Sequence, residues 1–295
     1  MTRFFLNIFN YFFLNILNHF SPLTFASQNL LLVKFLARLL RRWYRSIPQD
    51  EQGRLLWGKF FRRLVLKITL WFLGLSIGST LLFAVVPVPV TPLMIGRFWE
   101  QLWEPDRPVR LDNYWVGYKN LSPHLQLAVV CSEDQDFLEH EGFDFQAIEK
   151  AYTYNRTHKQ KHGASTISQQ TAKNVFLWPS RSWLRKGFEI YFTFLIETIW
   201  SKQRIMTVYL NVIEFGDGIY GAEAAAQNFF HKSAKNLNRE EAAMLAAVLP
   251  SPLNYSAIRP SSQVREKQRW ILSQMRMWGN RIDYEDPNTP KKPER

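Results

Sequence analysis

The sequence predicts a mainly α-helical protein that is anchored in a membrane by a single N-terminal transmembrane helix. Two observations carry this prediction. An uncharged, largely apolar run extends from Ile68 to Gly96. From Phe98 onward most apolar residues recur at helical spacing rather than in strand-like alternation. The chain has 295 residues, of which 46% are hydrophobic, so the part that follows the apolar run can form one sizeable core.

The residues that precede the apolar run are strongly basic. Between residues 34 and 67, ten Lys and Arg residues face only Asp50 and Glu51, so a surplus of eight positive charges, out of a net +12, lies in this short segment. The first 33 residues are apolar and nearly uncharged, and they read equally well as a second membrane-associated segment or as an extension without a structural role. We assign residues 1–67 to a basic N-terminal extension.

The apolar run fits a membrane span. Residues 68–86 are long enough to cross roughly 30 Å of hydrocarbon as a helix, and the PVPVTP segment after them ends the helix. The run starts too late and is too long for a cleaved signal peptide. We assign residues 68–92 to the anchor. Because the basic flank lies on its N-terminal side, we expect a cytoplasmic N-terminus and a C-terminal part outside the cytoplasm.

Residues 93–275 are expected to form one helical domain. The best strand candidate is VRLDNYWVGY at 109–118. Thr166 with Gln169, and Asn238 with Glu241, are capping boxes that predict helix starts. The remaining polar segment, 276–295, is expected to be a disordered tail. The expected helices span residues 122–130, 166–175, 182–200, 202–213 and 238–249.

Composition narrows the possible partners. Cys131 is the only cysteine, which excludes an internal disulfide framework and a multi-cysteine metal site. A pI near 9.8 indicates an anionic partner, which could be nucleic acid, anionic lipid or phosphate. Because most of the positive surplus flanks the membrane span, lipid and phosphate are favoured and nucleic acid is not expected.

An acidic stretch, CSEDQDFLEHEGFD, occupies residues 131–144 of this basic chain. It could be a solvated turn, a metal site or an active site. An apolar helix leads directly to Glu133, and partial desolvation there would suit a general base. The acids around His140 lack the spacing of metal ligands, and no HExxH occurs. The residues alone leave the solvated turn and the catalytic carboxylate equally open.

Two further segments have charge patterns that suit an anionic ligand. In GASTISQQTAKN, 163–174, Lys173 is the only charge and shares a helix face with Gln169 and Gln170, although a capped surface helix is the simpler explanation. In RSWLRKGFE, 181–189, Glu189 falls on the apolar flank of its helix and must be either paired or functional. The adjacent Arg181, Arg185 and Lys186 form a cationic group suited to phosphate.

A third segment, GDGIYG at 216–221, fits the pattern of a dinucleotide-binding loop. A helix rather than a strand is expected before it, and no βαβ unit surrounds it. We therefore expect a tight connection between two helices and no nicotinamide cofactor.

Taken together, these segments resemble the peptidoglycan glycosyltransferase family, and within it the monofunctional, membrane-anchored biosynthetic transglycosylases. Five motifs carry the resemblance, which covers Leu111 to Ser262. They are EDQDFLEHEGFD (133–144), GASTISQQTAKN (163–174), RKGFE (185–189), YLNVIEFGDGIYG (209–221) and EEAAMLAAVLPSP (240–252).

The resemblance implies a lysozyme-like helical fold for a periplasmic glycosyltransferase domain, and it implies roles for particular residues. Glu133 corresponds to the catalytic base and Glu189 to a second essential carboxylate. Lys173 and Arg181 correspond to cations that hold the pyrophosphate of the donor. The other residues implied in substrate binding are Ser165, Gln169, Gln170, Asn174, Arg185 and Lys186.

The implied reaction is inverting polymerisation of glycan strands from lipid II at the inner membrane. No cofactor is required, although Mg²⁺ or another divalent ion could bridge phosphates, and no protein metal site is visible. Cell-division or elongation proteins are candidate partners. The chain contains neither S-x-x-K nor K-T-G, so we expect no transpeptidase activity. The alternatives are a lysozyme-like hydrolase or lytic transglycosylase, and a non-catalytic membrane-anchored scaffold that binds glycan or lipid.

Overall fold

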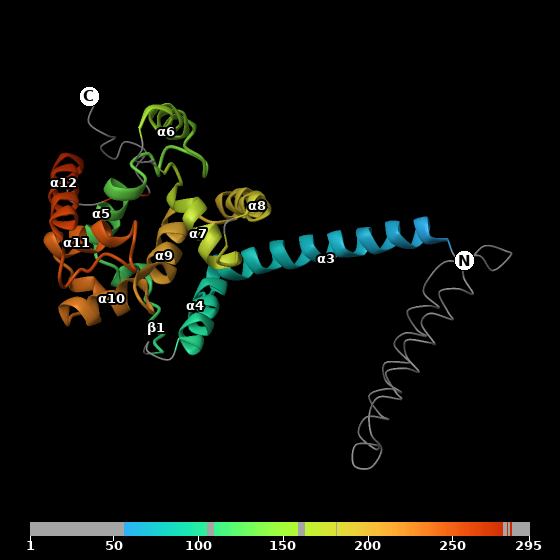
Figure 1. Ribbon diagram of the computed structural model, residues 1–295, viewed down its shortest axis with the longest axis horizontal. Coiled ribbons are helices and arrows are strands. Elements are labelled where there is room, and N and C mark those ends of the chain that lie inside the picture. The colour runs from blue at the N-terminus through green and yellow to red at the C-terminus, as the bar shows by residue number, and fades with distance from the viewer. Residues whose placement is uncertain are drawn as a thin grey trace, which may run out of the picture. The chain divides into compact units, whose positions relative to one another are not determined.

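The computed structural model describes residues 56–104, 109–158, 163–180 and 182–279, together with residues 282 and 284. The chain divides into two compact units, residues 1–73 and 74–295. The predicted extension 1–67 falls in the first unit and lies mostly outside the described residues. The second unit is mainly helical, as predicted (Figure 1).

Helix α3, Trp57–Val85, is the one helix in the described part of the chain that is long and apolar enough to cross a membrane. Its uncharged part, from Ile68 onward, rises about 27 Å, which is close to the thickness of the hydrocarbon layer. Its apolar side chains are uncovered: Trp71 is 70% and Leu75 is 66% exposed. The helix ends at Val85, so residues 86–91 of the predicted anchor are not helical. Pro87 and Pro89 there cannot donate backbone hydrogen bonds.

The C-terminal turns of α3, from Gly74 onward, belong to the second unit and contact two of its helices, α8 (Trp183–Ile199) and α9 (Lys202–Val212). The Trp200 indole N–H donates to Thr80 O at 2.8 Å. The Arg204 guanidinium donates to Phe83 O at 2.7 and 3.0 Å and to Val86 O at 2.5 Å. Since the last carbonyls of a helix have no partners within it, Arg204 closes the C-terminal end of α3.

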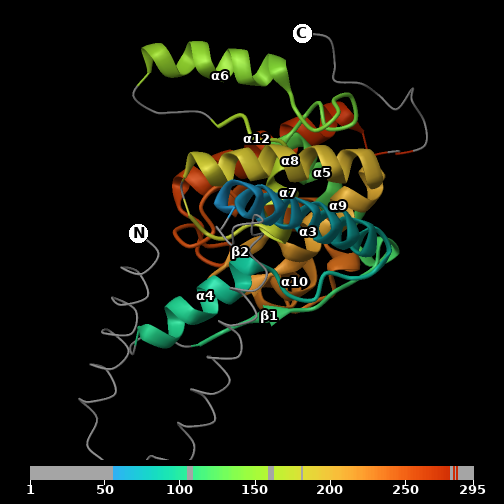
Figure 2. The ribbon, with the colours of Figure 1, turned by 90° about the vertical axis from the view of Figure 1, so that its right-hand side faces the viewer.

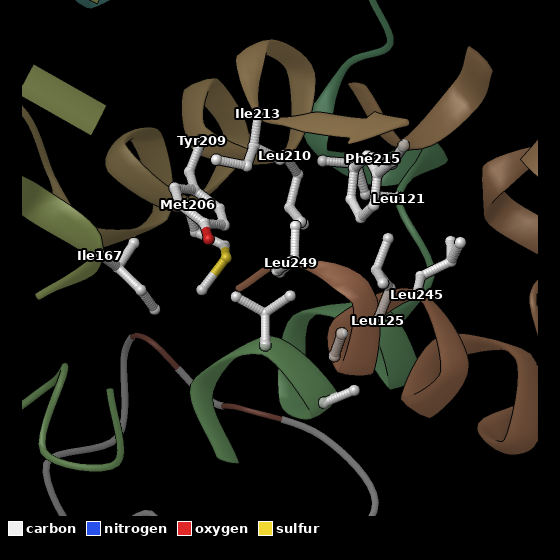
Figure 3. Packing of buried hydrophobic residues seen from close by; sticks show 14 of the residues in the cluster. Leu121, Leu125, Ile167, Met206, Tyr209, Leu210, Ile213, Phe215, Leu245 and Leu249 are labelled. Atoms are coloured by element: carbon white, nitrogen blue, oxygen red, sulfur yellow. The ribbon is translucent and has the colours of Figure 1, made fainter. Parts of the chain in front are cut away.

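The core of the second unit surrounds α5, Pro123–Glu133, which begins after the N-cap Ser122 and is buried from Leu125 to Cys131. Helices α11 (Arg239–Val248) and α12 (Ser262–Trp278) pack against it. Helix α7, Ile167–Phe176, packs against α8 and α9. Figure 3 shows apolar side chains of α9 meeting those of α5 and α11. An apolar sequence such as LQLAVV therefore forms a helix that is covered on all sides.

Helix α10, Gly221–Phe230, follows the small sheet, and its buried N-terminal half packs against α9. Helix α4, Pro92–Trp103, begins after the N-cap Thr91. Helix α6, Phe145–Thr157, was not predicted from the sequence and has no buried residue. Figures 1 and 2 both show α6 at the edge of the helical body.

A short three-stranded sheet, in the order β1-β3-β2, joins separate parts of the second unit. Its strands are β1 (Asp112–Asn113), β2 (Glu214–Gly216) and β3 (Ile219–Tyr220), and 3₁₀ turns lie at Tyr118–Asn120 and Ala234–Asn236. The predicted strand at 109–118 is therefore only two residues long. GDGIYG connects α9 and α10, as predicted, but as a β-hairpin. Gly221 has a φ of 80°, and a Cβ there would lie 2.7 Å from Asn211 O, so only glycine fits.

The helices predicted around the motifs are confirmed to within one residue for 166–175, 182–200 and 202–213, and both capping boxes form. The predicted domain end at residue 275 is too early. Helix α12 continues to Trp278, and Ile282 is buried beyond it, so part of the predicted tail 276–295 belongs to the core. The polar composition of residues 276–295 made the whole segment look like a tail.

Candidate active site

Glu133 is the last residue of α5, and its side chain is 14% exposed. Ser132 Oγ donates to its Oε1 at 3.0 Å, and Gln170 Nε2 donates to its Oε2 at 3.2 Å. Lys267 Nζ, from α12, lies 3.6 Å from Oε1. The carboxylate is thus held by groups from α5, α7 and α12, yet it keeps some access to solvent. Such a carboxylate can accept a proton from a substrate hydroxyl.

Asp134 fixes the end of α5 to the start of α7. Its Oδ2 accepts the backbone N–H of Ile167 at 2.9 Å, and its carboxylate contacts His140 Nε2 at 2.9 Å. The Gly142 N–H donates to His140 Nδ1, so in the neutral ring Nε2 carries the proton and donates to Asp134. This joint places Gln170, one turn into α7, beside Glu133.

The turn after α5 is held by residues of α8 and of the start of α7. Gly142 has a φ of 90°, and a Cβ there would lie 2.8 Å from Thr193 Cγ2. Thr166 Oγ1 donates to Gly142 O at 2.7 Å, which ties the turn to the N-cap of α7. Asp144 is the N-cap of α6. Asp134 and Asp144 therefore have structural roles, whereas Glu139 and Glu141 are exposed.

Glu189 lies on α8 and is only 3% exposed. Arg185 Nη1 donates to its Oε2 at 3.0 Å, and Lys186 Nζ donates to its Oε1 at 2.5 Å. The sequence prediction that Glu189 sits on the apolar flank of its helix is confirmed, because Ile196 and Trp200 are buried too. A buried carboxylate is stable only when it is paired. Here the pairing also holds two cations in fixed positions.

Lys173, on α7, completes a cation cluster that we define as Lys173, Arg185 and Lys186. Burial lowers the pKa of Lys173, and the charges of Arg185 and Lys186 lower it further. The nearby Glu189 and, more weakly, Glu133 act in the opposite direction. Within the described residues the Lys173 ammonium has no hydrogen bond or ion pair. The cluster carries three positive charges against one from Glu189, so it suits an anionic ligand.

The other predicted site residues differ in their environments. Gln170 contacts Glu133, but Gln169 is buried and its Oε1 accepts the Thr166 N–H in the capping box. Ser165 is exposed just before that N-cap. Asn174 is buried, and its Nδ2 has no partner among the described residues, so it could donate to a ligand. Arg181 lies outside the described residues.

Lys267 and Tyr209 are site residues that sequence reasoning did not select. Tyr209 OH donates to Gln170 Oε1 at 3.2 Å. Tyr209 is the first residue of the fourth motif. Its place in a motif indicated that it matters but did not indicate its role. Lys267 lies beyond the motifs, and its proximity to Glu133 depends on how α12 packs against α5. No pattern within α12 could have predicted that contact.

The cation cluster does not fit a resident divalent ion. Among the described residues no group of three or more His, Cys, Asp or Glu side chains lies close enough to hold a metal. Both carboxylate oxygens of Glu189 already accept hydrogen bonds from cations. A divalent ion would be repelled by the three positive charges around that carboxylate.

The site therefore combines a partly exposed carboxylate, a group of cations on neighbouring helices, and a helical domain joined to an apolar anchor. This combination is typical of transferases that deprotonate an acceptor hydroxyl while a phosphate-bearing group leaves.

Comparison with known proteins assigns the family. Residues 105–276, more than half of the chain, match the model of the transglycosylase family. The chain is 54% identical over 214 residues to the biosynthetic peptidoglycan transglycosylase of Bdellovibrio bacteriovorus, covering 72% of this chain and 85% of the relative. The protein of the same name from Cronobacter sakazakii is 51% identical, covering 74% and 90%. That from Salmonella agona is 52% identical, covering 75% and 91%. The chain belongs to the transglycosylase family.

Proposed function

We propose that this protein polymerises the glycan strands of peptidoglycan. It transfers the lipid-linked growing chain onto the GlcNAc 4-hydroxyl of lipid II, forms a β-1,4 bond and releases undecaprenyl pyrophosphate. Family membership and the names of the relatives support this proposal. One structural observation carries it: helix α7 bears both Gln170, which donates to Glu133 Oε2 at 3.2 Å, and Lys173, and it packs against α8, which bears Glu189. The proposed base and the cation cluster thus belong to one site.

Glu133 is the proposed general base. As the 4-hydroxyl oxygen of the acceptor attacks C1 of the donor sugar, its proton passes to the Glu133 carboxylate. The bond between C1 and the pyrophosphate oxygen breaks at the same time, and the electron pair leaves with the pyrophosphate. Attack from the face opposite an α-linked leaving group gives the β bond. A single base therefore suffices, and no covalent sugar intermediate is needed.

The cation cluster is the proposed site for the departing pyrophosphate. Charge develops on the leaving oxygen, and cations already held in position stabilise it without reorganisation. Glu189 holds Arg185 and Lys186 through the contacts at 3.0 and 2.5 Å. Lys173 remains free of ion pairs within the described chain, which leaves its ammonium available to phosphate. Arg181 is proposed to join them, on the strength of the motif alone.

The anchor places this reaction at a membrane. The basic residues before α3 favour a cytoplasmic N-terminus, so the catalytic domain is proposed to lie in the periplasm. Large apolar side chains near the site and on α4 support contact with lipid: Trp183 is 93% exposed, and Trp99 and Trp103 are exposed as well. Such a surface suits an enzyme whose two substrates carry polyprenyl chains.

The decisive comparison is between lipid II and finished glycan as substrates. Purified full-length protein in detergent is expected to convert labelled lipid II into long glycan and to leave mature peptidoglycan intact. Release of soluble fragments from mature glycan would instead support the lysozyme-like alternative, which has no use for a cation cluster. Binding of lipid II without turnover would support a scaffold.

A further inference from the structure

A hydrogen-bond chain connects the interior of the domain to Glu133. Tyr209 OH, from α9, donates to Gln170 Oε1 at 3.2 Å. Gln170 Nε2, from α7, then donates to Glu133 Oε2 at 3.2 Å. Gln170 is thus the middle member of a chain whose two ends differ. One end is a buried phenol and the other is the carboxylate proposed as the base.

The direction of these bonds follows from their chemistry. An ionised carboxylate only accepts hydrogen bonds, so the Gln170 amide must present its NH₂ group to Glu133. The amide oxygen then faces Tyr209, and the phenol must donate. If the amide turned over, its oxygen would face the carboxylate and repel it. The last torsion of a glutamine side chain is soft, so without an outside partner little would oppose that rotation.

Tyr209 is built to remain a donor. The side chain is fully buried, in the packed region between α9 and α5 where Figure 3 shows its ring and hydroxyl oxygen. Burial raises the pKa of the phenol well above its ordinary value, and the charges of Glu133 and Asp134 raise it further. The hydroxyl therefore keeps its proton throughout the pH range in which the protein works, and surrounding side chains fix its position.

We infer that Tyr209 is a positioning residue for the reaction. Its hydroxyl sets the orientation of the Gln170 amide, and the amide in turn holds the Glu133 carboxylate in the geometry that accepts the proton. This inference rests on the proposed function, because it concerns the residue assigned there as the base. It adds a role for a fourth-motif residue that does not itself touch substrate.

Tyr209→Phe removes the hydroxyl and keeps the ring, so the core stays filled. Loss of one hydrogen bond that selects the active orientation is expected to lower kcat about three- to tenfold. The KM for lipid II should change by less than about twofold, because Tyr209 is not proposed to contact substrate. A purely structural role would lower the melting temperature without this split between kcat and KM.

A double-mutant cycle isolates the proposed path. Tyr209→Phe is introduced into the full-length protein and into the Gln170→Ala variant, and lipid II polymerisation is measured for all four proteins. Without the amide, loss of the phenol is expected to change kcat by less than about twofold. An equal loss of kcat in both backgrounds, or no loss from Tyr209→Phe in the unmodified protein, would overturn the inference.

Tyr284→Phe is the matched control. Tyr284 OH donates to Gln126 Oε1 at 3.1 Å, which likewise pairs a tyrosine hydroxyl with a glutamine amide, although Tyr284 is only partly buried. Gln126 Nε2 faces Leu121 O, not a carboxylate. This control is expected to keep its kcat, and a loss equal to that of Tyr209→Phe would overturn the inference.

Glu133→Gln distinguishes failure of the proposed base from failure of the inferred role of Tyr209. If it stays active, the base assignment fails; if it is inactive while the cycle shows no coupling, only the role of Tyr209 fails.

Discussion

At the scale of single residues, the six acids of residues 133–144 have different roles. Glu133 faces a polar group of side chains from other helices, and Asp134 binds a histidine and a backbone N–H. Asp144 caps a helix, and Glu139 and Glu141 are exposed. Glu133 and Asp134 are neighbours at the end of one helix, yet the first is proposed to take part in the chemistry and the second holds the structure together.

Lys173 gives the sharpest prediction at this scale. Burial lowers its pKa, so the folded protein binds this proton less well than the unfolded chain, and the charged side chain opposes folding at neutral pH. Lys173→Met should therefore leave the melting temperature unchanged or higher. Polymerisation of lipid II should fall on the order of 100-fold, as when one preorganised charge is removed from a transition state.

The pH dependence of that stability change has a definite sign. Because the folded pKa is lowered, the penalty is present at neutral pH and fades as the pH rises from the lowered pKa of the folded state to the ordinary value of 10.5. Any gain in melting temperature from Lys173→Met should shrink in parallel. Lys235→Met, at an exposed position, is the matched control and should retain activity. Full activity of Lys173→Met would remove Lys173 from the proposed phosphate site.

The sequence predicted the local members of the site but not its tertiary contacts. Helical spacing placed Glu189 on an apolar flank, and the structure buries it there. The motif resemblance selected Glu133, which composition alone did not distinguish from a solvated acid. Lys267 was missed because it reaches Glu133 only through the packing of α12 on α5. Helical periodicity predicts which face of a helix is buried, but it does not predict which other element packs against that face.

At the scale of elements, the joint between α5 and α7 and the end of α3 depend on a few side chains that satisfy helix termini. Capping boxes could be predicted because they are local in sequence. Helix α6 was not predicted, and the structure leaves its apolar residues Phe145, Ile148 and Tyr152 exposed rather than in the core. The closure of α3 by Arg204 also escaped prediction, since the two partners lie more than 100 residues apart.

Arg204→Lys tests that closure. A lysine ammonium cannot reproduce three contacts from a planar guanidinium to two carbonyl oxygens. The change is expected to lower the free energy of unfolding by about 1–2 kcal/mol, measured by thermal unfolding of the full chain in detergent. Arg276→Lys, at an exposed position on α12, should have almost no effect. Equal melting temperatures for both variants would show that α3 needs no such closure.

At the scale of the whole molecule, function depends on which side of the membrane the catalytic domain occupies. In the proposed reaction, the lipid-linked donor and acceptor both present their sugars at one membrane surface, so an anchored domain meets them without diffusing through solution. Only the charge asymmetry around α3 bears on the orientation: Lys59, Arg62, Arg63 and Lys67 precede the uncharged part of the helix.

Protease protection tests this orientation. In spheroplasts, where only the outer face of the inner membrane is accessible, added protease should degrade the domain from residue 93 onward. A cytoplasmic marker protein in the same sample should survive. In inverted vesicles the domain should be protected until detergent is added. Protection in spheroplasts together with cleavage in inverted vesicles would reverse the proposed topology.

The central claim is that the Glu133 carboxylate is the base of a glycan polymerase. The most direct test is the rate of lipid II polymerisation by Glu133→Gln, which keeps the size of the side chain but accepts protons far less readily. We expect the rate to fall by at least about 100-fold with an unchanged melting temperature, while Glu139→Gln, an exposed acid of the same stretch, keeps its activity. Polymerisation by Glu133→Gln at the rate of the unmodified protein would contradict the account.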